Sequence, residues 1–116
     1  MWSIDVALIE HWVKELDSDS RGQLFAALEL LQEYGPHLGR PLVDTVSNSK
    51  HRNMKELRPG SAGRSELRVL FAFDIERRAI MLIAGDKAGN WQPWYKKSIP
   101  IADRLFGEHQ DRLGGK

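Results

Sequence analysis

Basic side chains are concentrated in one stretch of this chain. Residues 50–97 hold eleven Lys and Arg but five Asp and Glu, a local charge of +6, whereas the remaining residues sum to −5. A basic segment inside a nearly neutral protein indicates an anionic partner for that segment. The acidic remainder argues against a protein that coats nucleic acid indiscriminately.

The spacing of these cations predicts where they gather. In the run Arg64 to Asp74, the alternating apolar residues must be buried, so Arg64, Glu66 and Arg68 share the opposite face of a strand. The preceding expected strand brings Glu56 and Arg58 on one face and Lys55 on the other, and Lys87 follows the next strand. We therefore expect a group of cations on one surface of a sheet.

Such a group suits a phosphodiester. Arg binds phosphate through two parallel hydrogen bonds, and Lys acts as a compact charge or as a proton carrier. Cleavage of RNA by its own 2′-hydroxyl needs a base, cations for the crowded phosphorane and an acid for the leaving oxygen, but no metal. Lys87, Arg64 and Arg68 could supply these functions. The alternative is a solvent-exposed face of ion pairs, with Glu56 and Glu66 as partners.

The aromatic residues that follow this stretch have two interpretations. Trp91, Trp94 and Tyr95 are interleaved with Lys96 and Lys97, so they could stack on unpaired bases. The commoner use of Trp and Tyr in a short loop is to attach that loop to the core.

Other kinds of site are not indicated. The chain has no Cys, and its four histidines are too dispersed for a metal-ligand pattern. His51 is expected first as a surface loop residue and His109 as a hydrogen-bonded core or interface residue. No Ser-His-Asp arrangement, P-loop or dinucleotide-binding pattern is present.

The 116 residues predict a single domain, residues 1–116, of the α+β class in the order β-α-α-β-β-β-α, with the helices on one sheet face. A short strand at residues 2–6 precedes two helices, separated by Asp17 to Ser20 and ended by Gly35-Pro36. Phe25 is expected on the buried face of the second helix. Residues 37–53 have no clear period and predict a mobile loop that could hold a short strand or a bulge around Leu42-Val43.

The second half of the chain predicts strands and a closing helix. Strands are expected from Met54, from Arg64 to Asp74 and from Ala79 to Ala84, the last buried on both faces. A turn is expected at residues 59–63. The closing helix is expected to begin at Ser98 to Pro100 and to end at residues 114–115.

Secretion and membrane insertion are not predicted. No apolar run approaches the length that crosses a bilayer, and acidic residues interrupt the start of the chain where a signal peptide would be apolar. A cytoplasmic location is the simplest expectation.

Four pieces of sequence carry a family resemblance: MKELRP, GRSELRVLFAFD, an apolar strand ending in GDK, and WYKKSIPIAD. In this order, together with the opening strand, the two helices and the G-x-x-L-x-x-P at Gly35 to Pro41, they resemble the RelE/HigB superfamily of toxins. The similarity is to the HigB branch, also called phage-derived Gp49-like proteins, and it covers nearly the whole chain.

The resemblance implies an N-terminal helical hairpin and a C-terminal helix packed on a small, twisted, mainly antiparallel sheet. It also implies a metal-independent endoribonuclease, without a cofactor, that cuts mRNA in the ribosomal A site and so inhibits translation and growth. Its implied partners are mRNA, the ribosome and a cognate antitoxin with a helix-turn-helix DNA-binding domain.

Carried over by position, the resemblance implies a role for each basic residue. Arg68 would clamp a phosphate, with Glu56 orienting it, and Lys87 would stabilise the transition state or carry a proton. Arg64, Lys55 and Arg58 would hold flanking phosphates, and Lys96 would join the RNA-binding set. Relatives that place a Tyr or His acid–base residue near the C-terminus differ from this chain, in which Tyr95 is the nearest substitute.

Two other functions remain open at this point. The chain could be a non-catalytic member of the same fold that binds RNA or a protein. It could also be a small phage-derived accessory protein whose basic face is merely solvated.

Overall fold

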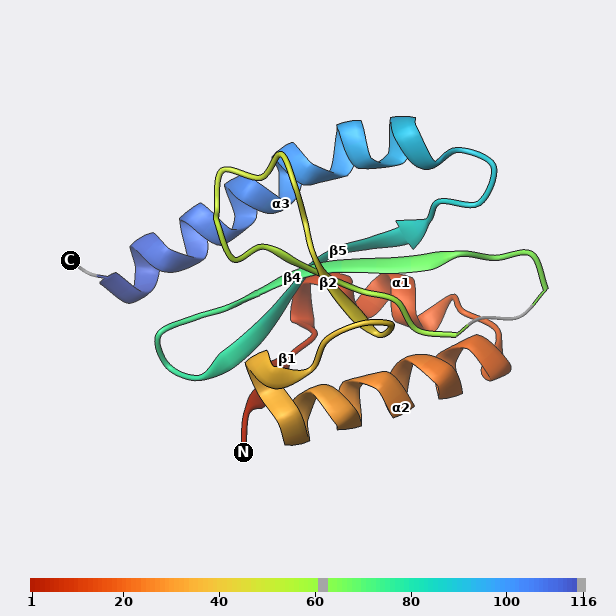
Figure 1. Ribbon diagram of the computed structural model, residues 1–116, viewed down its shortest axis with the longest axis horizontal. Coiled ribbons are helices and arrows are strands. Elements are labelled where there is room, and N and C mark those ends of the chain that lie inside the picture. The colour runs from red at the N-terminus through yellow and green to blue at the C-terminus, as the bar shows by residue number, and fades with distance from the viewer. Residues whose placement is uncertain (61–62, 115–116) are drawn as a thin grey trace.

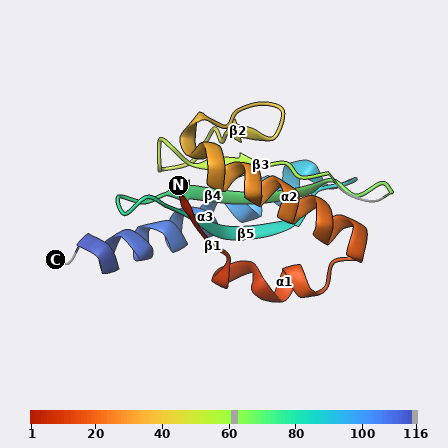
Figure 2. The same cartoon turned by 90° about the horizontal axis from the view of Figure 1, so that it is seen from below.

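Five strands form one sheet at the centre of the molecule, and helices cover both of its faces (Figures 1 and 2). The computed structural model describes residues 1–60 and 63–114. The spatial order is β1-β5-β4-β3-β2, with β1 parallel to β5 and every other pair antiparallel. The strands are β1 (Ser3–Asp5), β2 (Val43–Thr45), β3 (Lys55–Leu57), β4 (Leu67–Phe73) and β5 (Arg78–Asp86). The α+β class and the mainly antiparallel sheet are confirmed.

The N-terminal helices cover one face. They are η1 (Ala7–Ile9), α1 (Glu10–Lys14), α2 (Ser18–Tyr34) and η2 (Gly35–His37). Asp17 caps α2, since its Oδ2 accepts a hydrogen bond of 2.9 Å from the Ser20 amide. Leu24, Leu28 and Leu31 are buried against the sheet. Phe25, expected beside them, is 47% exposed because it lies one helical step away from that stripe.

The C-terminal helix α3 (Trp91–Gly114) lies on the opposite face (Figure 2). The expectation that all helices share one face was therefore wrong. The central strands are apolar on both sides, and a second core gathers on the α3 side around Leu70, Ile80 and Phe106. This second apolar surface needs its own covering helix.

Helix α3 also begins earlier than predicted, at Trp91 instead of Ser98 to Pro100. Pro93 lies in its first turn, where the missing amide proton costs nothing, and the Trp94 amide donates to the Asn90 carbonyl at 3.0 Å. The sequence predicts Pro100 at the start of this helix, but Pro100 lies inside it. The three aromatic residues expected in a loop are therefore helical.

A β-bulge sets which residues of β5 face α3. Leu70 pairs with Ile83 but Phe71 pairs with Met81, so Leu82 is the extra residue. Leu82 and Ile83 both pack in the second core, and Gly85 then pairs with Arg68. On the other side of β4, Glu56 pairs with Leu70. Glu56, Arg68 and Gly85 thus share the face that α3 covers, and the bulge sets the position of Gly85.

The segment before β3 is held against α3. Asp103 is buried and accepts hydrogen bonds from the Ser49 hydroxyl (2.5 Å) and the Lys50 amide (3.0 Å). Of the strand or bulge that was possible around Leu42-Val43, the strand is present as β2. Of the turn expected at 59–63 and the helix end at 114–115, residues 61, 62 and 115 lie outside the described part of the chain. No helix within the described ranges has both the length and the apolar character needed to cross a membrane.

Candidate functional site

Glu56 is a buried carboxylate at the centre of the basic residues. Its side chain is 5% exposed. One oxygen accepts a hydrogen bond of 2.9 Å from Arg58 Nε, and the other accepts one from the hydroxyl of Tyr95 on α3. A buried carboxylate is stable only when it is paired and hydrogen-bonded, and here two different elements supply the partners. Glu56 therefore ties β3 to the first turns of α3.

Arg68 lies on β4 beside the Glu56 carboxylate, and only part of its guanidinium is hydrogen-bonded. Its Nε is 3.9 Å from Glu56, beyond hydrogen-bonding distance, and has no hydrogen-bond partner among the described residues. One terminal nitrogen donates to the Leu67 carbonyl at 2.7 Å, and the other is 4.0 Å from Glu66. A buried donor without an acceptor costs about 1–3 kcal/mol. An anion placed against this guanidinium would remove that cost.

Lys87 completes the group of cations. It follows β5, and its Nζ is 3.2 Å from Glu66 Oε1 and 5.9 Å from the ring centroid of Tyr95. The backbone amide of Lys87 also donates to the Glu66 carbonyl at 3.0 Å. Arg58, Arg68 and Lys87 thus surround Tyr95 and the carboxylates of Glu56 and Glu66. We call these six residues the cation cluster.

Tyr95 is neutral in this environment. Burial raises the pKa of its phenol, the hydrogen bond to Glu56 raises it further, and the result is a pKa of about 12. At neutral pH the phenol therefore donates to Glu56 and does not form a phenolate. The hydrogen bond that Arg58 donates to Glu56 raises the pKa of the Arg58 guanidinium, which stays charged.

Three of the predicted site residues lie outside the cation cluster. Lys55 is on the other face of the sheet, with its Nζ donating to Thr45 Oγ1 at 3.0 Å. Arg64 is exposed in the turn before β4, since the strand begins three residues later than its alternation suggested. Lys96 is exposed on α3, one residue beyond Tyr95.

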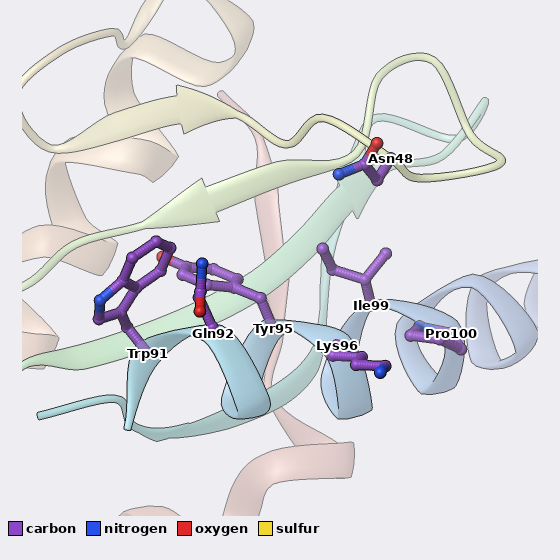
Figure 3. A pocket seen from close by; sticks show the side chains of 7 residues that line it. All are labelled: Asn48, Trp91, Gln92, Tyr95, Lys96, Ile99 and Pro100. Atoms are coloured by element: carbon purple, nitrogen blue, oxygen red, sulfur yellow. The ribbon is translucent and has the colours of Figure 1, made fainter. Parts of the chain in front are cut away.

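Two hollows adjoin the cation cluster. One, of about 310 Å³, is lined by Glu56, Arg58 and Tyr95 and by the loop after β2. The other, of about 440 Å³, lies over the start of α3 between Asn48 and Trp91 (Figure 3). Both share Asn48, Trp91, Tyr95 and Ile99, so they are neighbouring parts of one surface depression.

Sequence reasoning missed two residues of this region. Asp44 lies 3.3 Å from Arg58 as a second ion-pair partner, and Asn48 lines both hollows. Both come from the segment without periodicity. The antiparallel pairing of β2 with β3 places Asp44, and the hydrogen bonds of Ser49 and Lys50 to Asp103 hold the loop that carries Asn48; sequence shows neither.

The histidines lie elsewhere. His51 contacts α3, with its ring 5.1 Å from that of Phe106. His109 is buried and 2.9 Å from Asp74, so the prediction of a hydrogen-bonded core histidine is confirmed. Within residues 1–60 and 63–114 no group of three His, Asp or Glu is placed to hold a metal ion.

Comparison with known proteins gives a consistent result. The family model described as "Phage derived protein Gp49-like" matches residues 11–107. The chain is 58% identical over 108 residues to "Putative toxin HigB2" of Mycobacterium tuberculosis, covering 93% of this chain and 54% of that protein. It is 53% identical over 106 residues to "Putative toxin HigB3" of the same organism, covering 87% of this chain and 90% of that protein. The chain thus spans about half the length of the first relative and most of the second.

Proposed function

We propose that this chain, which belongs to the phage-derived Gp49-like family, is the toxin of a type II toxin–antitoxin system and cleaves mRNA. The names of the two relatives support the toxin assignment. The observation that carries the proposed chemistry is the cation cluster, in which three cations surround a buried carboxylate and a neutral tyrosine beside an open depression.

The reaction that fits this cluster uses the 2′-hydroxyl of the RNA as nucleophile. The 2′-oxygen loses its proton and forms a bond to phosphorus, the bond from phosphorus to the 5′-oxygen breaks, and the leaving oxygen takes up a proton. The products are a 2′,3′-cyclic phosphate and a free 5′-hydroxyl. Every atom and proton comes from the substrate or from titratable groups of the protein.

Arg68 would hold the reacting phosphate, because its guanidinium has a buried N–H without an acceptor and lies beside Glu56, which lines the depression. Cations fixed around the pentacovalent phosphorus stabilise the charge that develops there. Arg58 would hold a flanking phosphate.

Tyr95 and Glu56 would act together on the 2′-hydroxyl. As the phenolic oxygen accepts the 2′-proton, the phenol passes its own proton to Glu56, so no phenolate is required. The Lys87 ammonium would give a proton to the 5′-oxygen, and the proton held by Glu56 returns through solvent after product release. In this scheme Glu56 accepts the proton instead of only orienting Arg68.

A second candidate is a non-catalytic member of the fold that binds RNA or a protein. It is favoured by one observation: Tyr95 holds its proton, with a pKa of about 12, and Glu56 already accepts a hydrogen bond from Arg58, so neither group is free to take up the 2′-proton. Where the bound ligand is RNA, the two candidates differ in whether the phosphodiester is cut.

The deciding experiment is to map the 5′ ends of cellular mRNA after brief expression of the wild type and of Lys87→Ala. Lys97→Ala, an exposed lysine on α3, is the matched control. New ends within reading frames for the wild type and Lys97→Ala, but not for Lys87→Ala, would support translation-coupled cleavage.

The other outcomes are equally informative. Cuts outside reading frames would mean a free ribonuclease. No new ends in any culture, with equal amounts of folded protein, would move the assignment to the non-catalytic candidate. We further propose a cognate antitoxin with a helix-turn-helix domain, whose co-expression should relieve growth arrest by the wild type.

A further inference from the structure

The 440 Å³ hollow adjoins the cation cluster, and apart from Tyr95 its lining residues have no part in the proposed proton transfers. It is lined by the loop after β2 and by the first three turns of α3 (Figure 3), at residues Asn48, Trp91, Gln92, Tyr95, Lys96, Ile99 and Pro100. Its size is within the range of small-ligand sites. Because it shares Tyr95 with the cation cluster, a nucleotide chain held by the cluster would place a neighbouring nucleotide over it.

Trp91 provides a free aromatic face in this hollow. Its side chain is 55% exposed, whereas Trp94 packs against Gly85 and edge-on against Tyr95 at 5.1 Å. Trp94 thus does what aromatic residues in such segments usually do, which is to attach the element to the core, and Trp91 does not. Figure 3 shows the Trp91 ring at one end of the hollow, with Gln92 and Tyr95 beside it.

Asn48 lies at the opposite end of the hollow, where its backbone conformation and the next residues of the loop fix its position. Its φ of 69° lies in the left-handed region, which Asn tolerates better than most residues. The next two residues are bound to the buried Asp103, and His51 Nε2 is 3.1 Å from the Asp103 carbonyl. The amide of Asn48 is therefore presented by a loop that α3 itself fixes in place.

We propose that this hollow is the subsite for one unpaired base of the RNA, adjacent to the phosphate that is cut. Trp91 stacks on the base, the amides of Asn48 and Gln92 bond to its polar edge, and Lys96 contacts the flanking phosphate. This inference rests on the proposed function and makes Trp91, Asn48 and Gln92 determinants of sequence preference.

The composition of the hollow favours a base over a protein side chain. A base has a flat apolar face and a polar edge, and single-stranded RNA is recognised by aromatic stacking together with hydrogen bonds to base edges. The hollow offers an indole, two primary amides and a lysine, next to a site with three more cations. An apolar side chain of a protein would leave those amides unpaired.

The test uses a fluorescein-labelled 2′-O-methyl RNA pentamer, which cannot be cut because its 2′-oxygens are blocked. Its affinity is measured by anisotropy at fixed salt, with the full set of bases and with one abasic residue placed at each position in turn. The proteins are the wild type, Trp91→Ala and Asn48→Gly, because Gly removes the amide and keeps the positive φ. Phe25→Ala, a similarly exposed aromatic on α2, is the control.

We expect one abasic position to weaken wild-type binding about tenfold and to have little further effect in Trp91→Ala. Asn48→Gly should bind the full pentamer more weakly and should shift the sequences cut in cells. Phe25→Ala should match the wild type.

Three results would overturn the inference. If Trp91→Ala responds to the abasic series as the wild type does, the base subsite is wrong even though the protein binds and cuts RNA. If the wild type neither binds the pentamer nor cuts mRNA, the proposed function fails together with the subsite. If Trp91→Ala keeps RNA affinity but loses binding to a co-expressed antitoxin, the hollow is a protein-docking site.

Discussion

Glu56 and Tyr95 form the central pair of the site, and their hydrogen bond has a measurable signature. Because Glu56 helps to raise the Tyr95 pKa to about 12, Glu56→Gln should lower that pKa. The titration is followed by absorbance in a Tyr34→Phe background, in which Tyr95 is the only tyrosine. The raised pKa also means that Tyr95 contributes stability below about pH 10, lost as pH rises through about 12. An unchanged titration in Glu56→Gln would contradict the pairing.

Arg68 tests whether phosphate is held by geometry or by charge alone. Arg68→Lys keeps the positive charge and loses the planar set of donors, so we expect cleavage to fall by about 10²-fold or more. Salt dependence of RNA binding should change little, because the number of cations is the same. Arg104→Lys, at an exposed position on α3, should cleave normally. Equal activity of both variants would show that Arg68 acts only as a point charge.

At the residue scale, sequence alone predicted which side chains gather in part of the candidate site. The positions of Arg68 and the Glu56-x-Arg58 pair could be predicted because alternation along a strand fixes which side chains share a face, and that of Lys87 because it directly follows a strand. Lys55 and Arg64 lie outside the cluster because the strand boundaries and the pairing register decide their positions. Asn48 could not be predicted, since hydrogen bonds to a residue more than fifty positions away place its loop.

Among the elements, the contact between β5 and α3 positions Tyr95. A Cβ on Gly85 would lie 2.3 Å from Trp94 Nε1, so Gly85→Ala must push the first turn of α3 away from the sheet. We expect a loss of about 1–3 kcal/mol in the free energy of unfolding, and slower cleavage because Tyr95 moves relative to Glu56. Denaturant unfolding and a cleavage assay measure the two effects.

The matched control for Gly85 is Gly22→Ala in α2, where nothing lies within 4 Å of the added methyl. It should stabilise the protein by about 0.5–1 kcal/mol and leave cleavage unchanged. If Gly85→Ala cleaves as fast as Gly22→Ala, the packing of Trp94 does not position the site.

The element that sequence predicted least well is α3. Its first turns contain Trp91, Pro93 and Trp94, a composition that favours a loop, and its Pro100 resembles a helix start. Tertiary packing outweighs these local preferences, because the apolar face of β4 and β5 needs a cover along its whole length. The β-bulge at Leu82, which brings Gly85 opposite Arg68, leaves no recognisable pattern in the sequence.

In the whole molecule, Asp74 joins the turn between β4 and β5 to the C-terminal half of α3. It is fully buried and accepts hydrogen bonds from the amides of Glu76 and Arg78, from Arg78 Nε and from His109 of α3. Burial raises the pKa of this carboxyl, but the hydrogen bonds from His109 and the turn outweigh burial, so the pKa is lowered. Its contribution to stability is present above the unfolded pKa of about 3.9 and is lost as pH falls through the lower folded value.

Asp74→Asn should therefore lower the free energy of unfolding by about 3–5 kcal/mol at pH 7, since Arg78 and His109 lose a buried partner. The deficit should shrink at pH 3, where the wild type is losing the same charge. Urea unfolding at both pH values measures this, with the exposed Asp111→Asn as control. If Asp74→Asn loses the same free energy of unfolding at both pH values, the shape of the Asp74 side chain, and not its charge, accounts for the effect.

The length of α3 has a practical consequence for spectroscopy. The helix runs without a break from Trp91, beside the site, to Gly114 at the other end of the molecule (Figure 1). Since the chain has no cysteine, Arg112→Cys would introduce its only thiol, separated from Trp91 by about 30 Å of helix. A dye attached there would leave the depression uncovered, and energy transfer to a labelled RNA would report which end of the strand lies over α3.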